Sequence, residues 1–135
     1  MFDRQFKDMT EARIRVAIID DDESVRKALS RLLRSAGMIT ESFDCAETFL
    51  EHRAEQQTDC LVIDVRMPGM DGGELLQRLT SEGNTLPAIV ITAYYDDGEV
   101  AESHFPGAVA VLLKPLDDAA LLRHIRAACG RDTHE

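Results

Sequence analysis

Four short apolar segments, separated by stretches with helical periodicity, limit the folds open to this chain more than any other feature. Each is predicted to form a buried strand: RVAII at 15–19, CLVIDV at 60–65, AIVIT at 88–92 and AVAVLL at 108–113. A weaker fifth segment, MITESF at 38–43, alternates in polarity as an edge strand does. Strands that are apolar on both sides and alternate with helices form a parallel sheet covered on both faces.

The segments between these strands have the spacing of amphipathic helices. Apolar residues at 25, 28, 29, 32, 33 and 36 fall on one helical face, and Gly37 is expected to end that helix. Further helices are predicted at 46–53, 73–80, 97–105 and 117–129, the last with Asp117 as its N-cap. The helix at 97–105 is a poor one, since Gly98 lies near its start and Pro106 follows it. The expected architecture is therefore α/β, with right-handed crossovers.

A chain of 135 residues is expected to form one domain. We predict an N-terminal extension at 1–13, a folded domain at 14–129 and a C-terminal tail at 130–135. The net charge of −10 argues against nucleic-acid or anionic-membrane binding by this segment. No apolar run has the length of a membrane span, and the three cysteines lack a zinc pattern. We therefore expect a cytoplasmic protein with reduced thiols.

Polar side chains gather where the predicted strands end. The first strand is followed by Asp20 and Asp21, the third contains Asp64, the fourth ends in Thr92, and the fifth is followed by Lys114. In an open parallel sheet, functional groups lie at the carboxyl ends of the strands, beside the topological switch point. In the strand order 2-1-3-4-5 the first and third strands are neighbours, so the three carboxylates should converge.

Converging carboxylates repel one another unless a cation lies between them. Oxygen-only ligands favour a hard ion, and few protein ligands with room for water favour Mg²⁺ over Ca²⁺. Magnesium bound in this way leaves positions for phosphate oxygens. The ammonium of Lys114 and the hydroxyl of Thr92 suit a phosphoryl group, and an aspartate is able to act as the nucleophile that carries it.

Five motifs in order resemble the receiver domains of two-component response regulators: IIDDDES, VIDVRMPGMDGGELL, IVITA, GAVAVLLKP and the closing amphipathic helix. Each motif alone is weak, but all five at these spacings, from about Arg15 to Cys129, are highly specific. Three segments are most similar in sequence to the FixJ subgroup: VRKALSRLLRSAG, VRMPGMDG and AIVITAYYDD. The resemblance implies a flavodoxin-like (βα)5 fold, a three-layer sandwich whose parallel sheet has the order 2-1-3-4-5. It also implies a phosphorelay protein, not a conventional enzyme, whose output face changes when the protein is phosphorylated.

The resemblance implies a magnesium site as the only cofactor site. Asp21 would bind the ion directly, Asp20 would act mainly through water, and Asp64 would supply a further oxygen. The backbone carbonyl of Arg66 would complete the protein ligands. The next acids, Asp22 and Glu23, lie beyond this pocket and are expected to serve the start of the first helix.

The resemblance also assigns the phosphoryl chemistry. Asp64 would be the phosphoacceptor, Thr92 the switch hydroxyl, and Lys114, before a cis proline, the cation that pairs with a phosphoryl oxygen. One position departs from the family pattern: Val111 lies where an aromatic residue usually reports phosphorylation. We therefore propose from the sequence that Tyr94 or Tyr95 takes over this part, in a loop that phosphorylation would reorder. The alternative is that Val111 merely fills space and that the shift is small.

The implied partner is a sensor histidine kinase or a phosphotransfer protein. The face formed by the fourth helix, fifth strand and fifth helix would carry the output and would allow a homodimer. The similarity to FixJ is also compatible with transcription regulation as the output of the full gene product.

Two other functions fit part of the sequence. DDDES fits the nucleophile motif of haloacid-dehalogenase-type phosphatases, with Asp20 as nucleophile. Those enzymes need further carboxylates after the lysine and usually a cap domain, and they would leave Asp64 without a role. The third function is that of a receiver-fold interaction module that is not phosphorylated, against which the intact acidic pocket argues.

Overall fold

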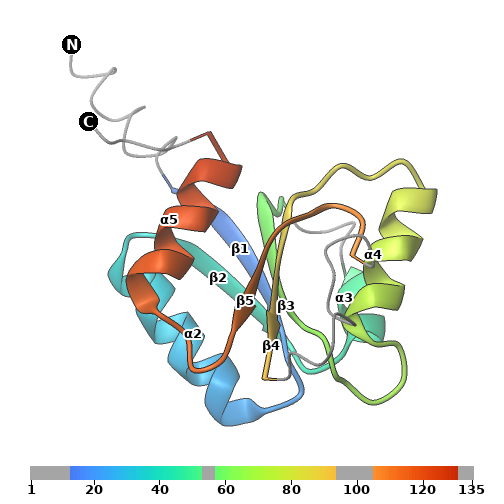
Figure 1. Cartoon of the computed structure of the whole chain (residues 1–135), viewed down its shortest axis with the longest axis horizontal. Helices are drawn as coiled ribbons and strands as arrows, with labels where there is room; N and C mark the ends of the chain where they lie inside the picture. Colours follow the sequence, from blue (N-terminus) through green and yellow to red (C-terminus); the bar gives the residue numbers. More distant parts are fainter. Residues whose placement is uncertain (1–12, 53–56, 94–104, 131–135) are drawn as a thin grey trace.

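The computed structural model describes residues 13–52, 57–93 and 105–130, which form a five-stranded parallel sheet between two layers of helices. The strand order is β2-β1-β3-β4-β5, as predicted, and the strands lie between the two groups of helices (Figure 1). The strands are β1 (Arg15–Ile19), β2 (Ile39–Phe43), β3 (Cys60–Asp64), β4 (Ala88–Thr92) and β5 (Ala108–Leu113). The strands β3 and β4, apolar up to their last residues, are buried along their whole length, whereas β2 lies at an edge and is partly exposed.

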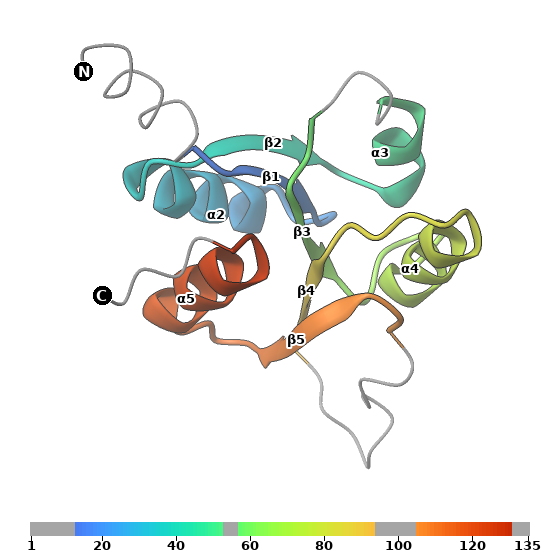
Figure 2. The same cartoon turned by 90° about the horizontal axis from the view of Figure 1, so that it is seen from above.

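The helices cover the sheet in pairs, α2 and α5 on one face and α3 and α4 on the other (Figure 2). They are α2 (Glu23–Ser35), α3 (Ala46–His52), α4 (Gly72–Ser81) and α5 (Asp118–Ala128). The three-layer α/β fold is thus confirmed. The helix predicted at 97–105 lies almost wholly outside the described residues. Within the described residues, no helix combines the length and the apolar character that crossing a membrane requires.

Each layer has its own apolar core. Leu29 and Leu33 of α2 pack with Leu121 and Ile125 of α5 against one face of the sheet. On the other face, Phe49 of α3 and the leucines of α4 pack against β1, β3 and β4. The central strands have nearly continuous apolar sequences because their side chains are buried on both faces of the sheet.

Three aspartates begin helices, two of them as predicted. Asp22 caps α2 by accepting from the backbone N–H groups of Ser24 and Val25, and Asp117 caps α5 in the same way. Asp71 forms a capping box with Glu74 at the start of α4. The predictions that Asp22 serves the first helix and that Asp117 is an N-cap are confirmed.

The strand register places the candidate site. Ile19 of β1 pairs with Ile63 of β3, so Asp20 leaves the sheet beside Asp64. Thr92 of β4 pairs with Leu113 of β5, so Lys114 follows next to Thr92. All four polar residues therefore lie at one edge of the sheet, at the carboxyl ends of its strands.

Candidate functional site

Three aspartates converge where β1 and β3 end. Asp20, Asp21 and Asp64 each offer a carboxylate oxygen, and these oxygens lie within 4.8 Å of one another. Asp20 and Asp64 are buried and Asp21 is exposed. The convergence expected from the strand order is therefore present, with an opening toward solvent on the side of Asp21.

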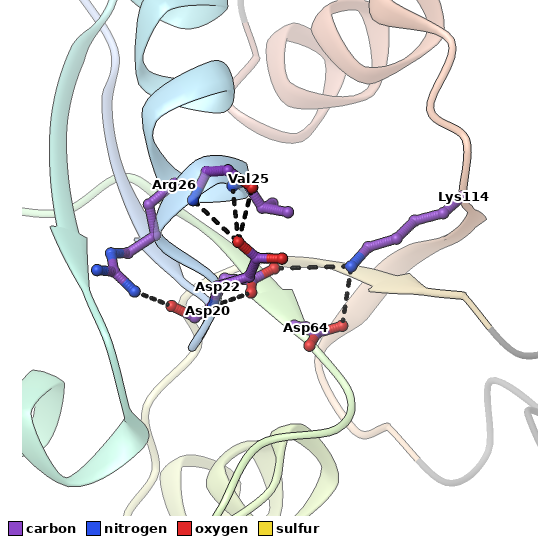
Figure 3. Close-up of polar contacts among 7 residues, drawn as sticks. Asp20, Asp22, Val25, Arg26, Asp64 and Lys114 are labelled. Carbon is purple, nitrogen blue, oxygen red and sulfur yellow. Dashed lines mark hydrogen bonds and ion pairs between the residues drawn. The ribbon is translucent and has the colours of Figure 1, made fainter.

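Asp20 is held in place by its neighbours (Figure 3). Its Oδ1 accepts from the backbone N–H of Asp22 at 2.8 Å, and its own N–H donates to the carbonyl of Phe43 at 3.1 Å. Arg26, one turn into α2, donates from Nη1 to the carbonyl of Asp20 at 2.8 Å. Both the carboxylate and the backbone of Asp20 are thus oriented before any ligand binds.

Lys114 reaches the cluster from the end of β5. Its Nζ lies 3.6 Å from Oδ1 of Asp64 and 3.8 Å from Oδ2 of Asp20 (Figure 3). Its backbone N–H donates to the carbonyl of Thr92 at 2.9 Å, and the peptide bond to Pro115 is cis, as predicted. A single half-buried ammonium therefore contacts both buried carboxylates.

Burial, with neighbouring negative charges, disfavours the ionised forms of Asp20 and Asp64. Burial, and after it the negative charge of Asp20, raises the pKa of Asp64 to about 6, while Lys114 acts in the opposite direction. Burial also raises the pKa of Asp20, against the hydrogen bond from Asp22 and the charge of Lys114. Asp22 differs, because a hydrogen bond from the Ser24 hydroxyl lowers its pKa. The buried pair is therefore short of positive charge.

The donor set fits a hard divalent cation. Carboxylate oxygens that converge, are short of positive charge and remain open to water on one side are the ligands that Mg²⁺ prefers. Asp20, Asp21 and Asp64 would hold such an ion. The part assigned to the carbonyl of Arg66, in the loop after β3, stays a prediction.

Thr92, the predicted switch hydroxyl, and Val111, which stands where an aromatic residue is expected, lie in β4 and β5. Thr92 is buried at the end of β4, next to the strand that carries Asp64. Val111 is half-buried in β5 and packs against the core on the α3–α4 face. Tyr94 and Tyr95 lie outside the described residues, so their proposed movement stays a prediction.

Sequence reasoning missed two side chains that hold the backbone of the site. Arg26 fixes the end of β1 through the carbonyl of Asp20. Glu47 of α3 accepts from the backbone N–H of Met70, in the loop after Asp64, at 3.0 Å. Arg26 is close to the acids in sequence, but 23 residues separate Glu47 from Met70, and no local pattern signals their contact.

Comparison with known proteins gives one consistent result. The profile described as "Response regulator receiver domain" matches residues 16–126. The transcriptional regulatory protein FixJ of Azorhizobium caulinodans is 39% identical over 120 residues, which are 89% of this chain and 57% of FixJ. The chain spans about half the length of the curated relatives it matches.

Solved structures agree with this result. The response regulator StyR is 45% identical with a TM-score of 0.80, over 89% of this chain and 61% of StyR. Full-length FixJ from B. japonicum is 37% identical with a TM-score of 0.79, over 89% of this chain and 59% of that protein. The family profile, which matches residues 16–126, includes the three aspartates of the site and Lys114.

Proposed function

The chain belongs to the response regulator receiver domain family, and from this premise we propose that it accepts a phosphoryl group from a histidine kinase on Asp64. A receiver is not a conventional enzyme, because the protein itself is the product of the reaction. The observation that carries the proposal is the approach of three carboxylate oxygens within 4.8 Å of one another, with Lys114 beside two of the three carboxylates.

Among the buried carboxylates, Asp64 is the better nucleophile. One oxygen of Asp20 accepts from the N–H of Asp22 and the other faces Lys114, so neither is free of a partner. Asp64 ends a buried strand, and Lys114 lies near its Oδ1. In the proposed reaction an oxygen of Asp64 forms a bond to phosphorus, and the bond between phosphorus and the donor's leaving group breaks.

The other residues have supporting parts. A bound Mg²⁺ supplies positive charge for the phosphoryl oxygens. Asp20 and Asp21 hold that ion, Lys114 pairs with a phosphoryl oxygen, and the Thr92 hydroxyl donates to another. The phosphorylated form then differs from the free form in its contacts to Lys114 and Thr92, which biases a two-state equilibrium toward the active conformation.

Acetyl phosphate tests the reaction without a kinase. With Mg²⁺, the wild-type protein should gain the mass of one phosphoryl group, and peptide mapping should place it on Asp64. Chelation of magnesium should prevent the gain. A label on Asp20 would instead support the phosphatase, and no label at all would support a receiver-fold module that is not phosphorylated.

We further propose that a homodimer forms through β5 and α5 when Asp64 is phosphorylated. Val109 and Leu113 of β5 are large apolar residues that are 49% and 46% exposed, on an edge strand. Exposed apolar side chains on an edge strand favour association. The rest of the predicted output face lies outside the described residues.

Sedimentation with and without the phosphoryl mimic beryllofluoride tests this dimer. The wild type should double its mass when the mimic binds, and Leu113→Glu should remain monomeric because a charge would enter the interface. Arg31→Glu, at an exposed position of α2 and outside both β5 and α5, is the control and should dimerise. An unchanged wild-type mass would refute the dimer.

A further inference from the structure

The loop that joins Asp64 to α4 lies beside the acidic cluster and carries Arg66. Its start is tied to β4, since the N–H of Val65 donates to the carbonyl of Ile91 at 3.1 Å, and its end is tied to its start, since the N–H of Gly72 donates to the carbonyl of Val65 at 3.0 Å. Between these ends the chain turns through Pro68 and Gly69. Arg66 follows Val65 directly, so its carbonyl lies between the tied start of the loop and this turn.

A side chain from a different helix holds the middle of the loop. Oε2 of Glu47, in the first turn of α3, accepts from the backbone N–H of Met70 at 3.0 Å. Gly69 has φ +76°, and a Cβ built on it would lie 2.8 Å from Oε2 of Glu47. The carboxylate therefore lies directly against the loop backbone, and glycine at this position leaves room for it.

The contact favours the ionised carboxylate. The hydrogen bond from the Met70 N–H is the largest cause that lowers the pKa of Glu47. A carboxylate that accepts from a backbone N–H forms a charge-assisted bond, which is stronger than a bond between neutral groups. The loop is therefore tied to α3 through its middle as well as to β4 through the N–H of Val65.

We infer that Glu47 is a positioning residue for the magnesium site: by fixing Met70 it holds the loop so that the carbonyl of Arg66 faces the acidic cluster. The inference rests on the proposed function, because it assumes that the cluster binds Mg²⁺. Glu47 does not touch the ion. Because Glu47 already orders the loop, the loop loses less conformational entropy when the ion binds.

Substitution of Glu47 should weaken magnesium binding without unfolding the protein. We expect Glu47→Ala to raise the Mg²⁺ dissociation constant by roughly three- to tenfold, the range of one hydrogen bond. Glu47→Gln keeps an oxygen that accepts from Met70 and should stay within about twofold of the wild type. Glu51→Ala, an exposed acid on the same helix, removes the same charge and should leave the constant unchanged. Equal affinities for Glu47→Ala and Glu51→Ala would overturn the inference.

A second measurement uses the unmodified protein. If the contact between Glu47 and Met70 aids magnesium binding, magnesium must strengthen that contact by the same factor, since coupling is reciprocal. Hydrogen exchange at the Met70 amide should therefore slow several-fold on addition of Mg²⁺. An exchange rate that Mg²⁺ leaves unchanged would contradict the inference even if the variants failed to fold.

A reference variant separates this inference from the proposed function. Asp21→Ala removes a proposed direct ligand and should weaken magnesium binding more than Glu47→Ala does. If Asp21→Ala weakens binding and Glu47→Ala does not, only the positioning part of Glu47 fails. If the wild type binds no magnesium, or binds it as Asp21→Ala does, the proposed metal site fails and the inference with it.

Discussion

Asp64→Asn is expected to abolish phosphorylation by acetyl phosphate and to stabilise the metal-free protein. The amide of asparagine has the shape of the carboxylate but is not a nucleophile of comparable strength. Burial and the charge of Asp20 raise the pKa of Asp64 to about 6 in the folded protein. At neutral pH the ionised Asp64 therefore costs folding free energy, and asparagine removes that cost, on the order of 2 kcal/mol. The pKa of about 6 already includes the opposing effect of Lys114.

Two measurements check this prediction. Mass spectrometry after treatment with acetyl phosphate and Mg²⁺ should show no added phosphoryl group on Asp64→Asn. Urea unfolding in the presence of a chelator should show a higher free energy of unfolding than for the wild type. Asp44→Asn, an exposed aspartate between β2 and α3, should keep both wild-type values. A variant that is still labelled would remove Asp64 as the phosphoacceptor, and unchanged stability would mean that the carboxylates do not strain the fold.

The effect of Mg²⁺ on stability should differ between the wild type and Asp64→Asn for the same reason. In the wild type, Mg²⁺ binds a cluster of three carboxylates and should raise the melting temperature, because a ligand that binds only the folded state stabilises it. Asp64→Asn has two carboxylates and should gain less from the ion. The variant would thus be more stable than the wild type without magnesium and would lose that advantage as magnesium is added.

The sheet and the site could be predicted from sequence because both depend on local patterns. In a β-branched apolar run such as AIVIT the side chains on both faces of the strand must be buried, and only a central strand of the sheet allows this. Once the strands are placed, Asp20, Asp64 and Lys114 follow from their positions at strand ends. No contact between distant segments has to be known for this step beyond the order of the strands.

The supports of the site could not be predicted, since they depend on tertiary contacts. Glu47 is an ordinary acid in the first turn of a short helix, and only the folded chain brings it to Met70. Gly72 lies among the turn formers of RMPGMDGG, and the sequence alone indicates only turn geometry there. In the structure it is the first residue of α4, and its requirement for glycine comes from the neighbouring strand.

Gly72→Ala is expected to destabilise the folded protein and to slow its phosphorylation. A Cβ at this position would lie 2.7 Å from the carbonyl oxygen of Asp64, 2.9 Å from Cγ2 of Ile63 and 3.2 Å from Cα of Val65. Two of these atoms belong to the backbone and cannot rotate away. The start of α4 would have to move outward from β3, at a cost of about 1 to 3 kcal/mol. The same movement would displace the loop that follows Asp64, which is why phosphorylation should slow.

The predicted change in the free energy of unfolding has the opposite sign from the change that helix propensity alone would give. Alanine in a helix is favoured over glycine by about 1 kcal/mol, so without the collision Gly72→Ala would stabilise α4. Gly83→Ala is the matched control: a Cβ there meets nothing within 4 Å, and only its φ of +80° opposes alanine. Urea unfolding should show a lower free energy of unfolding for Gly72→Ala than for the wild type. Acetyl phosphate should label Gly83→Ala at the wild-type rate and Gly72→Ala more slowly. A Gly72→Ala protein as stable as the wild type would mean that α4 does not approach Asp64 as closely as the structure shows.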